Sequence, residues 1–189
     1  MTPWTLEPTE PDIAIAGAVA RYTNRSAETF LRGLTWGADE KVLLGLACFG
    51  WLATRGQSEP VRRAGSHVLA LAIATAMVPH AMKAMVDQTR PDRTTVVGHL
   101  HGVSLSGTRD DSFPSGHALH MGALASLATA LPVAPRYAVQ ALAVGLSASR
   151  VLILAHWASD VITGFTLGAI LERALRLVTG FPAPRKMQE

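Results

Sequence analysis

Apolar runs rich in Ala, Leu and Val recur along the chain, and short polar links separate them. A helix that crosses a bilayer needs about 20 apolar residues, and several of these runs reach that length only with polar flanking residues. No segment alternates apolar and polar residues over a useful length, so strands are not expected. The pattern predicts an all-α, polytopic transmembrane helix bundle with about five spanning helices. The candidate spans are Val42–Thr54, His67–Met85, Ala118–Leu131, Tyr137–Ala155 and Val161–Val178.

The alternative to a membrane bundle is a soluble all-helical domain with an alanine-rich core. No repeat, linker or low-complexity block divides the sequence, so residues 1–189 are expected to form a single domain. Asp12 is the expected N-cap of a helix that runs to about Arg32. This helix is too polar to span, so we expect it to be an N-terminal interfacial helix. No cleavable signal peptide is expected, because the chain opens with prolines and acids rather than a basic flank.

The charged residues lie mainly at the ends of the apolar segments. The net charge is +3, but the arginines form no stripe along one segment, so nucleic acid is not expected as a partner. The single cysteine, Cys48, excludes an internal disulfide and is expected to be a small buried hydrophobe. In a five-span bundle the positive-inside rule makes one side cytoplasmic. The basic residues on that side are Arg55, Arg62, Arg63, Arg136, Arg185 and Lys186.

Three polar clusters interrupt the apolar segments, and the predicted topology puts all three at the opposite membrane face. They contain Lys83 and Arg90, the sequence PSGH at 114–117, and the sequence SRVLILAHWASD at 149–160. Burying an unpaired charge in hydrocarbon is costly, so ionisable residues in such segments usually mark a site. Lys83, Arg90 and Arg150 would repel one another without a shared anion, and phosphate suits them because Arg binds its oxygens bidentately. A helix start at Pro-Ser-Gly adds free backbone N–H groups and a hydroxyl to that anion site.

His156 and Asp160 are four residues apart, which puts them on one face if the segment is helical. A carboxylate can accept a hydrogen bond from one imidazole nitrogen and leave the other free to attack phosphorus. His117, from another helix, is placed to protonate the leaving oxygen. Arg150 and His156 lie about 120° apart on a regular helix, so either Arg150 curls round or the helix ends near His156.

The motifs Lys83-x6-Arg90-Pro91, Pro114-Ser115-Gly116-His117 and Ser149-Arg150-x5-His156-x3-Asp160 resemble, in this order, the signature of the type 2 phosphatidic acid phosphatase superfamily. That superfamily includes lipid phosphate phosphatases, bacterial acid phosphatases and vanadium haloperoxidases. The match defines a motif-bearing core at residues 83–160 and keeps all spacings. The flanking helical pattern is similar to that of small bacterial membrane members, which implies a multi-pass protein of the bacterial inner membrane with a periplasmic site.

The resemblance implies a role for each matched residue. His156 is implied as the nucleophile that forms a phosphohistidine, and Asp160 as the partner that orients it. His117 is implied first as the general acid and then as the base that activates water. No metal or other cofactor is implied, because cationic side chains supply the electrostatic stabilisation. The residues implied to hold the phosphoryl oxygens are Lys83, Arg90, Ser115, Gly116 and Arg150.

The implied activity is hydrolysis of the phosphate or diphosphate headgroup of a membrane lipid. Undecaprenyl diphosphate and phosphatidylglycerol phosphate are the examples that suit a site at the outer face. Members that recycle undecaprenyl diphosphate often carry Asp where this sequence has Gly116. The sequence itself names neither the lipid nor the oligomeric state.

Other interpretations compete with this one. A vanadate-dependent haloperoxidase would have a similar site, but those members are generally larger and soluble. A non-catalytic lipid-binding or transport protein of the same fold predicts a lost catalytic residue, and none is lost here. His117 and His120 form an H-x-x-H pair that could hold a metal together with His156 and Asp160.

Several smaller features carry their own expectations. Asp110 and Asp111 precede the second motif and could either cap or tune the site or be solvated loop charges. Gly164 and Gly168 are spaced as small-xxx-small, which predicts close helix packing. His99 and His101 lie in the long link between the first two motifs, where a mobile polar loop is favoured over a gating role.

Overall fold

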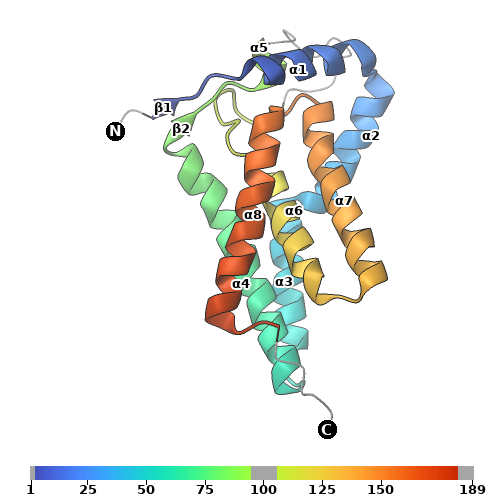
Figure 1. Ribbon diagram of the computed structural model, residues 1–189, viewed down its shortest axis with the longest axis vertical. Helices are drawn as coiled ribbons and strands as arrows, with labels where there is room; N and C mark the ends of the chain where they lie inside the picture. Colours follow the sequence, from blue (N-terminus) through green and yellow to red (C-terminus); the bar gives the residue numbers. More distant parts are fainter. Residues whose placement is uncertain (1–2, 95–105, 183–189) are drawn as a thin grey trace.

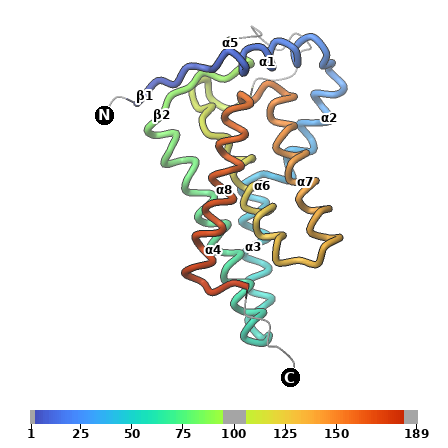
Figure 2. The backbone as a smooth tube through the Cα atoms, in the orientation of Figure 1, coloured from blue at the N-terminus to red at the C-terminus, as the bar shows by residue number. Residues whose placement is uncertain are grey.

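The computed structural model describes residues 3–94 and 106–182. Most of these residues are helical, as predicted, and five long helices make up the bundle (Figures 1 and 2). Each long helix overlaps one of the five candidate spans, although the boundaries differ. His99, His101, Arg185 and Lys186 lie outside the described residues. The long helices are α3 (Glu40–Ala53), α4 (Glu59–Lys83), α6 (Gly116–Leu127), α7 (Val133–Leu152) and α8 (Ala158–Thr179).

The N-terminal region forms two helices, α1 (Glu10–Tyr22) and α2 (Arg25–Thr35), where the sequence predicted one. The chain breaks at Asn24, because its side-chain oxygen accepts a hydrogen bond from the N–H of Ala27 at 3.0 Å and caps α2. Asp12 was also wrong as the N-cap. Thr9 caps α1, and Asp12 completes the capping box three residues later. In Figure 1, α1 lies across one end of the bundle and α2 descends beside α7.

The carboxylate of Asp12 also joins α1 to the start of α8. Its Oδ1 accepts a hydrogen bond from the N–H of Ser159 at 2.9 Å, and its Oδ2 accepts one from the hydroxyl of Ser159 at 2.8 Å. The first N–H groups of a helix lack partners within the helix. One side chain therefore satisfies donors at the beginning of two helices.

Short elements complete the fold. Two strands of two residues each pair in parallel, with Trp4 opposite Val86 and Thr5 opposite Asp87. The alternation rule could not find them, because two residues carry no period. The pairing holds the N-terminal segment against the link that follows α4. The short elements are β1 (Trp4–Thr5), β2 (Val86–Asp87), α5 (Pro91–Thr94), and the 3-10 turns η1 (Trp36–Ala38) and η2 (Ala128–Ala130).

The helices α6 and α8 pack against each other at backbone distance. A Cβ placed on Gly122 of α6 would lie 1.8 Å from the carbonyl oxygen of Phe165. A Cβ on Gly168 of α8 would lie 1.9 Å from a carbonyl oxygen of α6, and one on Gly164 would lie 2.5 Å from that of Ser115. The close packing predicted from Gly164 and Gly168 is therefore confirmed.

Among the described helices, α4 alone is long and apolar enough to cross a membrane by its own length and composition. The 14 residues of α3 and the 12 of α6 fall short of the usual length of a span. Cys48 was expected to be buried, but it is exposed. Large exposed apolar side chains on the long helices include Leu46, Phe49, Leu52, Ile73, Met77, Leu142, Val144, Ile162, Ile170 and Leu177.

Candidate active site

The three polar clusters meet at one end of the bundle, because each adjoins a helix end there. α4 ends at Lys83, α6 begins at Gly116, and α7 ends at Leu152. A cavity of about 400 Å³ lies between these helix ends. We refer to it as the catalytic pocket. Six of the eight predicted site residues line it: Lys83, Arg90, Gly116, His117, Arg150 and His156.

His156 lies in the turn between α7 and α8. The helix ends before it, which is one of the two geometries that the spacing from Arg150 allowed. The side chain is 3% exposed, and its Nδ1 donates a hydrogen bond to the carbonyl oxygen of Ser112 at 2.7 Å. Because Nδ1 carries the proton, Nε2 keeps its lone pair. Burial, followed by the charge of Arg90, lowers the pKa of His156 well below its usual value, so the ring is neutral.

Asp160 lies behind His156 without the hydrogen bond that the sequence predicted. It belongs to the first turn of α8, whereas His156 precedes that helix, so the two residues do not share a helix face. The distance from Nδ1 of His156 to Oδ2 of Asp160 is 3.8 Å. This oxygen accepts hydrogen bonds from the hydroxyl of Ser112 at 2.6 Å and the N–H of Trp157 at 2.9 Å. Ser112 therefore connects the two, through its carbonyl oxygen to the imidazole and through its hydroxyl to the carboxylate.

Arg90 is buried beside the imidazole. Its Nη1 donates to the carbonyl oxygen of Ala155 at 2.7 Å and lies 3.3 Å from Nε2 of His156. Its Nε donates to Oδ1 of Asp111 at 2.8 Å, and Lys83 lies 3.6 Å from the other oxygen of Asp111. Burial raises the pKa of Asp111, but the hydrogen bond and charge of Arg90 and the charge of Lys83 outweigh it and leave this pKa below its usual value. Asp111 is therefore a fixed anion that pairs with both cations rather than a solvated loop charge.

Arg150, in the last turn of α7, has one hydrogen-bond donor that is unpaired among the described residues. Its Nε is buried and has no hydrogen-bond partner within residues 3–94 and 106–182. A buried donor without a partner costs about 1–3 kcal/mol. An anion bound in the catalytic pocket would remove that cost, because the guanidinium lines the pocket.

Ser115 and Gly116 begin α6 but are placed differently. Ser115 is the N-cap of α6 and is fully buried, and its hydroxyl accepts a hydrogen bond from the N–H of Ala118 at 3.4 Å. Ser115 does not line the pocket. Gly116 lines the pocket, and a Cβ there would lie 3.6 Å from the ring of Pro79, an ordinary contact. The helix start therefore presents Gly116 and His117 to the pocket, while Ser115 holds the turn in place.

One part of the pocket wall was not found from the sequence. It comes from the start of α3 and the end of α4, where Oε2 of Glu40 lies 3.1 Å from Nε2 of His80. His120 completes this wall from α6. No motif connects these residues along the chain, so only the packing of α3 against α4 and α6 brings them together.

A metal site does not form from the H-x-x-H pair. The described residues include no group of three or more His, Cys, Asp or Glu side chains that could hold a metal ion. His117 and His120 both line the catalytic pocket, whereas Asp160 does not. The four side chains of the metal interpretation therefore do not come together as one group of ligands in the described part of the chain.

An apolar groove of about 200 Å³ adjoins the catalytic pocket between α3, α4 and α6. His120 lines both the pocket and the groove, so it marks their junction. The apolar side chains along the groove include Leu43, Leu46, Val68, Leu71, Leu124 and Leu127.

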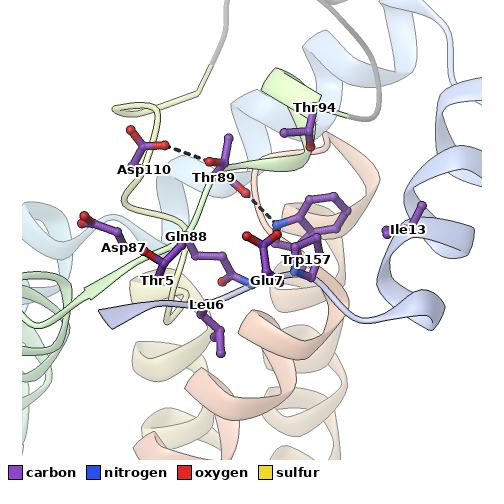
Figure 3. Close-up of a pocket in the computed structure, with 11 residues that line it drawn as sticks. Thr5, Leu6, Glu7, Ile13, Asp87, Gln88, Thr89, Thr94, Asp110 and Trp157 are labelled. Carbon is purple, nitrogen blue, oxygen red and sulfur yellow. Dashed lines mark hydrogen bonds between the residues drawn. The ribbon is translucent and has the colours of Figure 1, made fainter. Parts of the chain in front are cut away.

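Figure 3 shows a separate pocket of about 620 Å³ at the same end of the molecule. Trp157 forms part of it, and its indole N–H donates to the carbonyl oxygen of Thr89 at 2.8 Å. None of its described lining residues is Lys or Arg, so an anionic group is not expected there. Its ionisable lining residues are Glu7, Asp87 and Asp110.

A sequence model of the PAP2 superfamily matches residues 64–181. The match covers more than half of the chain and contains all three polar clusters. The chain belongs to the PAP2 superfamily. The resemblance of its motifs to those of type 2 phosphatidic acid phosphatases is thereby confirmed.

Two curated proteins similar to this PAP2 member are both lipid A 1-phosphatases. The chain is 31% identical over 119 residues to the one from Rhizobium johnstonii and 30% identical over 118 residues to the one from Rhizobium etli. The alignments cover 61% of this chain and 48% and 50% of those proteins. The chain therefore spans about half the length of the curated relatives it matches.

Two solved structures share the PAP2 fold with this chain. The crystal structure of Aquifex aeolicus LpxE has a TM-score of 0.69 at 17% identity, over 90% of this chain and 98% of that one. The PAP2 type phosphatidylglycerolphosphate phosphatase from Bacillus subtilis has a TM-score of 0.62 at 21% identity, over 94% of this chain and 88% of that one. At these identities the likeness establishes the fold alone.

Proposed function

We propose that this PAP2 superfamily member is an integral-membrane phosphatase that removes a phosphate group from a lipid through a phosphohistidine on His156. The setting of His156 carries the proposal. The imidazole is buried and neutral, the carbonyl oxygen of Ser112 accepts a hydrogen bond from its Nδ1–H, and its Nε2 keeps a lone pair in a pocket that Lys83, Arg90 and Arg150 also line.

In the proposed first step, Lys83, Arg90 and Arg150 hold the non-bridging oxygens of the phosphate group. Nε2 of His156 attacks phosphorus, so the N–P bond forms as the bond from phosphorus to the leaving oxygen breaks. His117 donates its proton to that oxygen. The free Nε of Arg150 gains an acceptor in this complex, which supports a role in binding the anion.

In the proposed second step, a water molecule attacks the phosphohistidine. His117 accepts its proton, the N–P bond breaks and inorganic phosphate leaves, which restores the neutral imidazole. While phosphorylated, the ring carries a positive charge, and the carboxylate of Asp160 at 3.8 Å stabilises it. The mechanism uses no metal or other cofactor, because the three cations neutralise the charge on the phosphoryl oxygens.

The proposed location is the bacterial inner membrane, with several crossings and the pocket on the periplasmic face. The length and composition of α4 and the exposed apolar side chains of the long helices support contact with a bilayer. Arg62 and Arg63 begin α4, and Arg55 lies just before it in the link after α3. In Figure 1 this link lies at the lower end of α4, whereas Lys83, which lines the pocket, is the last residue of that helix; the positive-inside rule makes the end with the link cytoplasmic.

The proposed substrate is a lipid that bears a phosphate group. The apolar groove beside the catalytic pocket supports this class, since it offers a place for hydrocarbon next to the phosphate. The two relatives named lipid A 1-phosphatase make lipid A 1-phosphate the first substrate to test. Phosphatidylglycerol phosphate and undecaprenyl diphosphate complete the panel.

The test is phosphate release by the purified, detergent-solubilised protein in EDTA. The expected result is release from one or more of these lipids that persists in EDTA and is lost in His156→Ala. A thermal unfolding curve of His156→Ala establishes that the variant is folded. Activity that survives this substitution would reject the phosphohistidine, and no release from any lipid would favour a non-catalytic lipid-binding protein.

A further inference from the structure

The catalytic pocket has two chemically different walls. One wall holds the cations and the two histidines of the proposed mechanism. The other holds Asp39, Glu40, Lys41, His80 and His120. A carboxylate beside a phosphate site repels the phosphate. Two carboxylates, Asp39 and Glu40, outnumber the one cation of this second wall, Lys41, so the wall is suited to a part of the substrate that presents hydrogen-bond donors.

Glu40 supplies a carboxylate with capacity to spare. Its Oε2 lies 3.1 Å from Nε2 of His80, and its other oxygen makes no hydrogen bond with the described residues. Asp39 also has one oxygen without a hydrogen bond to the described residues, but its carboxylate is fixed as the cap of α3, where Oδ1 accepts from the N–H of Lys41 at 2.9 Å and of Val42 at 3.4 Å. Glu40 is thus the carboxylate of this wall that is not held by a helix cap.

His120 is the second unused group. Its side chain is buried, with 6% exposed, and neither ring nitrogen makes a hydrogen bond within the described residues. It lines both the catalytic pocket and the apolar groove. A hydroxyl or amine of a ligand bound in the pocket can form a hydrogen bond with this imidazole, which offers one donor and one acceptor when neutral.

We propose that Glu40 and His120 form a leaving-group subsite, which binds a hydroxyl- or amine-bearing unit between the phosphate and the hydrocarbon chains of the substrate. The inference rests on the proposed function and adds the chemistry of the leaving group. The phosphate binds at the cationic wall, a sugar or glycerol unit binds at Glu40 and His120, and the hydrocarbon continues into the groove lined by Leu43 and Leu46.

The subsite discriminates against lipids whose hydrocarbon is bonded directly to the phosphate. Such a chain places methylene groups against Glu40 and His120, which leaves both without the partner that the correct substrate provides. A site built around polar groups rejects a ligand that lacks the matching donors more strongly than an apolar site does. Lipid A 1-phosphate carries such a unit, and farnesyl monophosphate does not.

The experiment compares kcat/KM for lipid A 1-phosphate and farnesyl monophosphate in the full-length, detergent-solubilised protein. Glu40→Ala and His120→Leu are expected to lower kcat/KM for lipid A 1-phosphate roughly tenfold each, which corresponds to one lost hydrogen bond. Neither variant is expected to lower kcat/KM for farnesyl monophosphate, because each removes a polar group that the hydrocarbon of this lipid leaves without a partner. His120→Asn retains a donor and an acceptor and is expected to recover part of the loss.

Glu7→Ala is the matched control, because Glu7 is an exposed carboxylate at the same end of the molecule that does not line the catalytic pocket. It is expected to change neither value. Equal losses on both lipids in Glu40→Ala and His120→Leu, or faster hydrolysis of farnesyl monophosphate by the unmodified protein, would overturn the subsite while the phosphatase activity stands. Failure of the proposed function itself looks different, since His156→Ala would then hydrolyse these lipids as fast as the parent.

Discussion

Replacing Asp160 by Asn separates the charge of this side chain from its hydrogen bonds. The oxygen of an Asn side chain can still accept from the hydroxyl of Ser112 and the N–H of Trp157, as Oδ2 of Asp160 does at 2.6 and 2.9 Å. The amide nitrogen then takes the place of Oδ1, which is buried and has no partner among the described residues. A buried donor without a partner costs about 1–3 kcal/mol, so the free energy of unfolding is expected to fall by no more than that, since the oxygen it replaces is itself without a partner.

The effect on catalysis is expected to be much larger. A unit negative charge 3.8 Å from the imidazole stabilises the phosphorylated, positively charged ring. Coulomb's law at an effective dielectric constant of about 20 makes this stabilisation about 4 kcal/mol. Loss of the charge should thus lower the rate of phosphate release roughly a thousandfold, since each 1.36 kcal/mol corresponds to about a factor of ten.

The assay is phosphate release at pH 8 by the parent protein, Asp160→Asn and Ser112→Ala, with thermal unfolding measured in parallel. Ser112→Ala is the informative comparison, because it removes the hydroxyl bond to Asp160 but keeps the carbonyl acceptor of the imidazole and the negative charge. We expect it to lose no more than about tenfold in rate. A folded Asp160→Asn that retains a rate within tenfold of the parent would refute the electrostatic role and leave Asp160 as a cap of α8.

Three further outcomes are expected. Gly122→Ala should lower the free energy of unfolding by about 3 kcal/mol, because its methyl group would meet a carbonyl oxygen of α8. Gly145→Ala is the control and should raise the free energy of unfolding by about 0.5–1 kcal/mol, because a Cβ there has nothing within 4 Å. Equal melting temperatures of the two variants would contradict the close packing of α6 and α8. Asp111 has a lowered pKa in the folded protein, so its stabilising effect should be complete above its unfolded pKa of about 4 and decline as the pH falls through the folded pKa. The melting-temperature advantage of the parent over Asp111→Asn should accordingly be present at pH 6 and shrink by pH 3, and a constant difference would refute the ion pairs. Arg150→Met should weaken inhibition by inorganic phosphate at least about tenfold. It should also stabilise the ligand-free protein by about 1–3 kcal/mol, because it removes a buried donor without a partner among the described residues. Unchanged inhibition by phosphate would exclude Arg150 from the anion site.

Helix positions followed from the sequence because apolar composition persists over whole segments. The start of α6 after Pro114-Ser115 and the packing of α8 through Gly164 and Gly168 were also readable, since each depends on residues adjacent in the chain. The break at Asn24 was missed because an Asn side chain that caps a helix looks, in sequence, like any polar residue within one. The strand pair at Trp4 was missed because a two-residue strand has no pattern.

The site was predictable as a set of residue types and less so as a geometry. The four-residue spacing predicted that His156 and Asp160 belong to one helix. They do not, because α7 ends at Leu152 and α8 begins only at Ala158. The acceptor for the imidazole is a backbone carbonyl at Ser112, and a carbonyl is present at every position of every sequence. Glu40 was missed because its place beside the pocket depends on how distant helices pack.

The attachment of Asp12 to Ser159 has a consequence for how the protein is made. The two residues are 147 positions apart, so α1 leaves the ribosome long before its partner is synthesised. At about 5–20 residues per second, the delay is roughly 7–30 seconds. During this time the carboxylate of Asp12 can form hydrogen bonds only with Thr9 at the start of α1. The contact cannot form until Ser159, in the first turn of α8, has been synthesised, so a nascent polypeptide that stops before α8 already contains His156 but lacks the anchor for its first helix.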